Sequence, residues 1–190
     1  MEGYFVHPSS IVESGAVIGK GSHIWHFCHV MPRVIIGENC NFGQNTFIDN
    51  NVQIGNGVKV QNNVSIYNGV QVADNAFIGP SVVFTNVINP RSFIERKDEY
   101  RKTILGKGCS IGANATIICG VTIGQYSLVG AGAVVTRDIP DFALVTGNPA
   151  RQKGWVSEAG HKLTFDEKLH AICPQTHNRY MLTNGTVSKV

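Results

Sequence analysis

Apolar residues recur at every sixth position over the first 84 residues of this chain. Within each six-residue unit, or hexad, the fifth residue is small or β-branched almost throughout, and the second is often glycine. Neither the alternation of an ordinary strand nor the 3.6-residue period of an amphipathic helix sustains such spacing. The residues that open the hexads are Val6, Val12, Ile18, Ile24, Val30, Ile36, Phe42, Ile48, Ile54, Val60, Ile66, Val72, Ile78 and Phe84.

The six-residue period predicts a coil of short strands. Each hexad supplies one strand and one corner, and three hexads close a triangular coil of 18 residues. The large opener and the small fifth residue are expected to point inward. Gly at the second position, and Asn or Gly at the corners, are expected to permit positive φ. Successive coils should stack about 4.8 Å apart, each covering the one beneath it.

The repeat stops near Asn89 and resumes at Leu105, 21 residues after Phe84. This interval breaks the six-residue phase, so residues 89–104 are predicted to form a loop inserted into a solenoid of residues 1–140. The pattern leaves open on which face the chain resumes. Residues 141–190 are predicted to form a C-terminal segment with a short helix over 155–169, in which Trp155, Leu163 and Leu169 cover the end of the solenoid. A hairpin is expected between 173 and 190, with its turn at Asn184-Gly185.

Composition narrows the function classes. Only 15% of the residues are charged, 21 are glycine and the net charge is +3, which favours turns and gives no reason to expect nucleic acid. There is no apolar run of about 20 residues and no secretion signal in residues 1–10, so a cytoplasmic protein without membrane insertion is expected. The five cysteines fit neither a disulfide framework nor a zinc site, and buried reduced thiols are predicted.

The hexads resemble those of the hexapeptide-repeat acyltransferases, an all-β superfamily that forms left-handed parallel β-helices, usually as trimers. The resemblance supplies the handedness and the homotrimer, because parallel connections are normally right-handed. The segment ALVTGNPARQK at 143–153 resembles the element that lies beside coenzyme A in these enzymes. Acetyl-CoA is therefore the implied co-substrate. The residues implied to bind it are Gly130 and Ala131, through a backbone N–H at the thioester oxygen, and Pro149, Arg151 and Lys153.

Five further segments resemble one narrower family, the bacterial UDP-sugar N-acetyltransferases that act on a 3-amino sugar uronate. They are IWHF at 24–27, FGQN at 42–45, VKVQNNVSIY at 58–67, VFTNVINPR at 83–91 and IERKDEYR at 94–101. This resemblance implies acetylation of the 3-amino group of a UDP-linked amino sugar, in the synthesis of an O-antigen or another surface-polysaccharide precursor.

Residues 18 apart should stack on one ridge of the coil. Asn86 ends such a ladder where the loop departs, and it is expected to orient the amine through its amide oxygen. His26 heads a second ladder with Gln44 and Asn62, which would line the sugar cleft. His26 is a candidate general base because the pKa of histidine is ordinarily near neutral. In the alternative mechanism the departing CoA sulfur accepts the proton.

The inserted loop is rich in arginine, which binds phosphate and carboxylate oxygens in a bidentate manner. Arg91, Arg96 and Arg101 are candidates for the diphosphate or the uronate. Tyr67 or Tyr100 would stack on the uracil or bond the sugar.

Several alternatives remain open at this point. The acceptor could be a dTDP-amino sugar or a hydroxyl compound such as serine, and the acyl group another short acid. A zinc-dependent hydratase of the same fold is a further alternative. However, His23, His26 and His29 lie within seven residues at unequal hexad positions, so no metal is expected. A scaffold without activity would leave the basic loop and the GNPAR segment unexplained.

Overall fold

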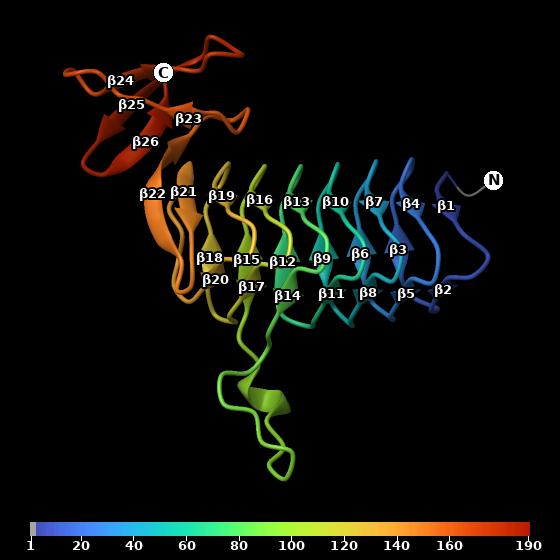
Figure 1. Cartoon of the computed structure of the whole chain (residues 1–190). Coiled ribbons are helices and arrows are strands. Elements are labelled where there is room, and N and C mark those ends of the chain that lie inside the picture. Colours follow the sequence, from blue (N-terminus) through green and yellow to red (C-terminus); the bar gives the residue numbers. More distant parts are fainter. Residues whose placement is uncertain (1–2) are drawn as a thin grey trace.

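A computed structural model describes residues 3–190 and shows a three-sided solenoid with a separate small sheet at its C-terminal end (Figure 1). The chain winds through three parallel sheets in turn, as a left-handed β-helix. The first face consists of β1 (Phe5–Val6), β4 (His23–Ile24), β7 (Asn41–Phe42), β10 (Lys59–Val60), β13 (Phe77–Ile78), β16 (Ser110–Ile111), β19 (Leu128–Val129) and β21 (Ala143–Thr146). The second face consists of β2 (Ile11–Val12), β5 (His29–Val30), β8 (Phe47–Ile48), β11 (Ser65–Ile66), β14 (Val83–Phe84), β17 (Thr116–Ile117) and β20 (Val134–Val135). The third consists of β3 (Val17–Ile18), β6 (Ile35–Ile36), β9 (Gln53–Ile54), β12 (Val70–Val72), β15 (Thr103–Leu105) and β18 (Thr122–Ile123).

The strand register confirms the 18-residue coil. Each strand pairs with the strand one coil further on, as His23 does with Asn41. The strands β12, β13 and β14, whose partners lie beyond the loop, pair instead with residues 33 positions later, as Val72 does with Leu105. The loop therefore adds residues to one coil without changing the face on which the chain resumes. At the last coil the spacing falls to 16, since Leu128 pairs with Leu144.

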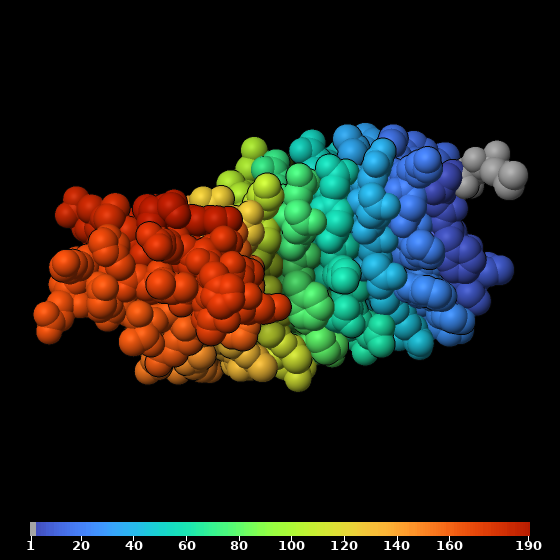
Figure 2. All heavy atoms as spheres, turned by 90° about the horizontal axis from the view of Figure 1, so that it is seen from above, coloured from blue at the N-terminus to red at the C-terminus, as the bar shows by residue number. Residues whose placement is uncertain are grey.

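The predicted core positions are buried. From Ile24 onward the hexad openers have almost no exposed surface, and the fifth residues from Cys28 onward are buried in the same way. The earliest openers, Val6 and Val12, are half-buried because no coil covers them on one side. A space-filling view shows the coils as adjoining bands along the solenoid (Figure 2).

Glycine serves two different purposes here, and one prediction about it was wrong. Positive φ falls at the fourth hexad position, as at Asn39 (56°) and Gly57 (65°). The second-position glycines have ordinary φ and are required for close stacking instead. A Cβ on Gly106, for example, would lie 2.6 Å from Gln125 N and 2.8 Å from Ile123 O, both in the next coil.

Side-chain amides and carboxylates also link neighbouring coils at these corners. The Asn62 Oδ1 accepts the N–H of Gln44 at 2.9 Å, and the Asp74 Oδ1 accepts that of Asn56 at 2.7 Å. Such bonds satisfy backbone donors that the short strands leave unpaired.

The C-terminal segment caps the solenoid with strands. β22 (Arg151–Val156) runs antiparallel to β21 and pairs with β23 (Lys162–Leu163). The predicted helix over 155–169 is therefore wrong. Gly160 and Leu169 have positive φ, which interrupts a helix, and the open edge of the last coil offers strand pairing. Trp155 nevertheless packs against the main core.

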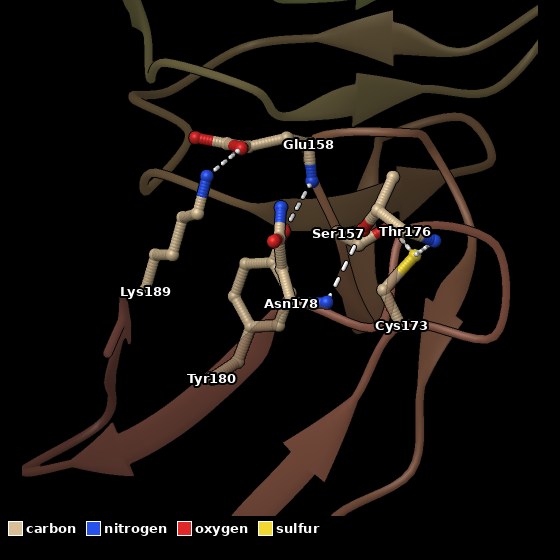
Figure 3. Close-up of polar contacts among 7 residues, drawn as sticks. All are labelled: Ser157, Glu158, Cys173, Thr176, Asn178, Tyr180 and Lys189. Atoms are coloured by element: carbon tan, nitrogen blue, oxygen red, sulfur yellow. Dashed lines mark hydrogen bonds and ion pairs between the residues drawn. The ribbon is translucent and has the colours of Figure 1, made fainter.

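A three-stranded sheet completes the chain, with β24 (His170–Ile172), β25 (Arg179–Thr183) and β26 (Thr186–Lys189). The predicted hairpin is confirmed, since Asn184 and Gly185 form the turn with φ of 51° and 74°. The Tyr180 side chain is fully buried, and its hydroxyl accepts the N–H of Glu158 at 3.0 Å (Figure 3).

Two further contacts hold this sheet to the link between β22 and β23. Lys189 Nζ lies 2.7 Å from the Glu158 carboxylate, and the Cys173 thiol donates to Ser157 Oγ at 3.2 Å (Figure 3). All five cysteines are free and buried, as predicted. Burial raises the pKa of the Cys109 thiol to about 12, so this residue stays neutral.

The two purposes of glycine can be separated by substitution. Gly106→Ala is expected to lower the free energy of unfolding by about 1–3 kcal/mol, because the added methyl meets backbone atoms that cannot give way. Gly132→Asn, at an open corner with φ of 68°, should stay within about 0.5 kcal/mol. Urea unfolding midpoints measure both. Equal shifts in the two variants would contradict the distinction.

Candidate functional site

The inserted loop leaves the solenoid at the corner between the second and third faces and projects away from it (Figure 1). It carries the one short 3-10 turn of the described chain, η1 (Lys97–Glu99). Two backbone bonds close its neck: Arg101 N–H donates to the Asn86 carbonyl, and Thr103 N–H to the Gly69 carbonyl, each at 3.0 Å. Asn86 is thereby held at the point where a rigid coil meets the loop.

The loop folds around an open groove of about 520 Å³. The groove brings together four of the residues that the sequence singled out, Asn86, Arg91, Arg96 and Tyr100. Tyr67 is not among its lining residues. It packs against the core with its ring edge-on to Phe47, at a centroid distance of 6.3 Å.

Arg96 has one buried hydrogen-bond donor in the groove that lacks a partner. Its Nη1 lies 2.6 Å from the Glu99 carboxylate, whereas its Nε is buried and has no hydrogen-bond partner among residues 3–190. A buried guanidinium N–H without an acceptor is costly, so the groove favours a ligand that supplies an oxygen there.

Among the other charged residues of the loop, some form ion pairs and some do not. Lys97 Nζ lies 2.8 Å from the Glu95 carboxylate and lowers the pKa of Glu95 by hydrogen bonding and by its charge. Arg91 donates only to the Pro90 carbonyl at 2.9 Å. Arg101 has no carboxylate partner in the described part of the chain. Arg91 and Arg101 are thus the loop arginines whose charge remains uncompensated.

Arg101 also explains a glycine in the neighbouring coil. A Cβ on Gly120 would lie 3.1 Å from the Arg101 Cδ, so the side chain of Arg101 runs across a surface that only glycine leaves open. Gly120 also has a φ of 90°, which favours glycine independently. The arginine is therefore held at the neck of the loop, beside Asn86.

The predicted ladder of His26, Gln44 and Asn62 lies at a different corner, between the first and second faces. Asn62 already uses its Oδ1 to accept the Gln44 N–H. His26 stacks on His7 with ring centroids 3.6 Å apart. The loop departs from the coil that contains Pro80, and Pro80 lies on the same corner as His26, three coils further along. At about 4.8 Å per coil this is roughly 14 Å along the axis, so one chain cannot bring His26 and Asn86 to the same amine.

The first–second corner continues to the last coils, where Gly130 and Ala131 lie. The N–H of Gly130 already donates to the Val145 carbonyl at 2.8 Å. The N–H of Ala131 has no partner among the described residues, which makes it the better candidate for the thioester oxygen. Pro149, Arg151 and Lys153 are exposed beyond this corner, the last two on β22.

The zinc alternative finds no ligand set in residues 3–190, where no three His, Cys, Asp or Glu side chains come together. His23 and His29 lie on strands of different faces, β4 and β5. In the same described range, no helix is long and apolar enough to cross a membrane.

Family comparison agrees with this architecture. Residues 15–50, 51–86 and 102–137 match the bacterial transferase hexapeptide model of six repeats, and 33–68 match the hexapeptide repeat of succinyl-transferase. The chain belongs to the bacterial hexapeptide-repeat transferases. The predictions of a hexapeptide β-helix and of an acyltransferase are thereby confirmed.

One relative of this hexapeptide transferase aligns with it over nearly the whole length of both chains. It is the dTDP-3-amino-3,6-dideoxy-alpha-D-galactopyranose 3-N-acetyltransferase of Aneurinibacillus thermoaerophilus, 50% identical over 186 residues, which cover 98% of this chain and 95% of the relative.

Two solved structures share the fold at lower identity. A galactoside acetyltransferase in complex with coenzyme A aligns with a TM-score of 0.58 and 27% identity, covering 68% of this chain and 72% of that one. PerB from Caulobacter crescentus, in complex with CoA and GDP-perosamine, aligns with a TM-score of 0.50 and 25% identity. That alignment covers 78% of this chain but only 56% of PerB.

The position of Asn86 generates a prediction. Asn86→Ala should lower turnover by about tenfold or more, since a hydrogen bond to the reacting amine would be lost, and should leave the unfolding midpoint nearly unchanged. Asn50→Ala is the matched control, because Asn50 lies two coils earlier on the same 18-residue ladder and its amide bonds the neighbouring Asp49 at 3.2 Å. The control should reduce stability more than turnover. The reverse result for Asn86→Ala would make this residue structural.

Proposed function

We propose that this protein transfers the acetyl group of acetyl-CoA to the 3-amino group of a nucleotide-linked amino sugar, in the cytoplasm. The observation that carries the proposal is the near full-length similarity, at 50% identity, to a sugar-nucleotide 3-N-acetyltransferase. The groove at the loop neck supports it, because it combines the Asn86 amide with Arg91, which has no carboxylate partner, and Arg96, which keeps one buried N–H unpaired.

Coenzyme A would lie along the first–second corner of the last coils. The free N–H of Ala131 would donate a hydrogen bond to the thioester oxygen as that oxygen gains negative charge, which is the chief electrostatic requirement of acyl transfer. Arg151 and Lys153 are exposed nearby and would bind the CoA phosphates.

The reaction needs a neutral amine next to the thioester carbonyl. Asn86 would accept one amine N–H through its amide oxygen and so direct the nitrogen lone pair at the carbonyl carbon. The C–N bond forms, the C–S bond breaks, and the amine proton passes to the departing CoA sulfur. Holding both reactants in line supplies much of the rate, so no protein base is required.

His26 as the general base is the less favoured route. Within one chain it lies three coils from the coil of Asn86, and its ring hydrogen-bonds to no carboxylate of residues 3–190. It would reach the amine only if a second subunit presented it there.

The acceptor proposed is a UDP-linked 3-amino uronate, a surface-polysaccharide precursor such as that of O-antigen. The loop segments at 83–91 and 94–101 support this, as do the uncompensated charges of Arg91 and Arg101, one for the diphosphate and one for the uronate. A neutral dTDP-linked 3-amino sugar is the second candidate, favoured by the Aneurinibacillus relative.

A homotrimer with sites between subunits completes the proposal. Large apolar side chains point outward on all three faces, among them Phe5, Ile11, Val17, Ile35 and Val83. The loop exposes 81% of Phe93 to solvent. Surfaces of this kind usually contact another protein, and a convex solenoid encloses a ligand only together with a neighbour.

Thiol release from acetyl-CoA, measured against a panel of UDP- and dTDP-linked amino sugars, tests the function directly. A 3-amino uronate linked to UDP should give the highest kcat/KM. Preference for a neutral dTDP sugar would select the second candidate. If none of the amino sugars in the panel supports thiol release, the proposal is overturned.

The loop arginines should act on one substrate only. Arg101→Ala and Arg96→Ala are expected to raise the KM for the nucleotide sugar by roughly 10–100-fold, the equivalent of a lost charged hydrogen bond, with the KM for acetyl-CoA nearly unchanged. Arg179→Ala, on the C-terminal sheet, is the control for loss of an exposed arginine. A rise in the KM for acetyl-CoA would assign the loop to the wrong ligand.

The assembly can be tested on the loop as well. Sedimentation of the wild type should give three times the chain mass of 20.6 kDa. Phe93→Ser should weaken the trimer and lower activity with it, whereas Ile172→Ser, an exposed apolar residue on the C-terminal sheet, should do neither. A fully active monomer would contradict sites shared between subunits.

A further inference from the structure

The first two coils carry an exposed cluster of aromatic rings that the reaction described above does not use. It lies at the N-terminal end of the solenoid, opposite the end capped by β22 (Figure 1). The cluster is centred on Trp25, His26 and Phe27 at the first–second corner and includes Phe5, His7 and His23. Trp25 is 39% exposed and Phe27 is 61% exposed.

Phe27 occupies a backbone position that phenylalanine disfavours. Its φ is +57°, in the left-handed region, at the fourth hexad position where most coils carry asparagine or glycine. The other exceptions in the described coils have visible reasons. Tyr126 stacks on Phe142 in the C-terminal core, Arg33 donates to Asn51, and Ser81 is small.

No comparable packing supports Phe27. Its ring neighbour is His26, at a centroid distance of 6.2 Å and an angle of 50°, and most of its surface is open. A strained, exposed ring that neither packs in a core nor bonds a neighbour points to a role outside folding.

Three of the neighbouring rings have nearly parallel planes, which suits a flat ligand. Trp25 and His26 are inclined by only 9°, and His23 and Trp25 by 18°, whereas Phe5 and Phe27 are tilted by 41–58° against their ring neighbours. Trp25 Nε1 donates to Asn41 Oδ1 at 2.8 Å, which fixes the indole plane. The ring cluster contains no carboxylate and no lysine or arginine, which suits an uncharged ring more than a phosphate.

The position of the cluster along the axis matches one part of the proposed acceptor. The first–second corner runs from the cluster, past Gln44 and Asn62, to Ala131 at the CoA end. The cluster lies roughly 14 Å from the coil where the loop departs. A diphosphate-linked sugar bound between subunits, as proposed above, with its amine at that level would extend its base toward these rings of the neighbouring subunit.

We infer that the ring cluster of Trp25, His26 and Phe27 is the stacking platform for the nucleobase of the acceptor. The inference rests on the proposed function and deepens it, since it assigns base recognition to the first coils. Adenine of coenzyme A has the same chemistry, but the exposed cations suited to CoA phosphates, Arg151 and Lys153, are at the opposite end of the solenoid.

Phe27→Asn tests the platform, because asparagine is the residue that other coils carry at this position and should fold without strain. The KM for the nucleotide sugar should rise roughly tenfold, as expected for one lost base–aromatic contact. The kcat and the KM for acetyl-CoA should change less than twofold. Arg33→Asn, in the same conformation at the next corner, is the matched control and should change none of these values.

Binding can be measured without catalysis in a Trp155→Phe background, which leaves Trp25 as the only tryptophan. UMP or dTMP should quench its fluorescence, whereas adenosine 3′,5′-bisphosphate, the nucleotide portion of CoA, should not. Phe27→Asn should weaken the binding of the nucleotide that quenches by a factor similar to the rise in KM.

Four results would overturn the inference: an unchanged KM for the nucleotide sugar with acetyl transfer intact, a raised KM for acetyl-CoA, quenching by the adenosine bisphosphate alone, or dissociation of the assembly in Phe27→Asn. The first leaves the proposed function standing. If no amino sugar is acetylated at all, the proposed function fails, and the UMP and dTMP titration still decides whether the rings bind a base.

Discussion

The close stacking of one coil on the next is the constraint from which the rest of the structure follows. Parallel strands lie about 4.8 Å apart, and at the corners the backbones approach so closely that a Cβ on Gly106 would meet main-chain atoms. Each coil must therefore be nearly identical in outline to its neighbours. Variation is confined to side chains that point outward and to insertions at corners, and the site residues are drawn from these two places.

The hexad pattern was sufficient to predict the solenoid because every coil repeats the same environment. A large opener and a small fifth residue bury themselves in each turn, as Ile24 and Cys28 do, so one rule covers the whole core. Asn184-Gly185 predicted its hairpin because both residues favour positive φ. The helix over 155–169 was mispredicted because strand pairing to the edge of β21 depends on the last coil and leaves no local signal.

The site was predictable to the extent that its residues are neighbours in sequence. Asn86, Arg91, Arg96 and Tyr100 share a groove because a single loop carries them. The distance between His26 and that loop depends on which corner each occupies. The hexad pattern in the sequence does not give this distance. The preference for Ala131 over Gly130 rests on one backbone bond to Val145 that only the folded last coil reveals. The ring cluster, by contrast, left a signal in the sequence: Phe27 stands where Asn or Gly is the rule.

The reversal of direction at β22 also governs how the molecule ends. A stack of parallel coils presents a row of unpaired backbone groups at its last edge, and any further coil, from the same or another molecule, could add there. On the first face β22 covers that edge with an antiparallel strand, and β23 pairs in turn with β22. A chain that runs backwards offers no template for a further left-handed turn. The capping strands therefore act as a terminator of growth, and they let a periodic architecture, which has no intrinsic length, exist as a molecule of defined size and not as a fibre.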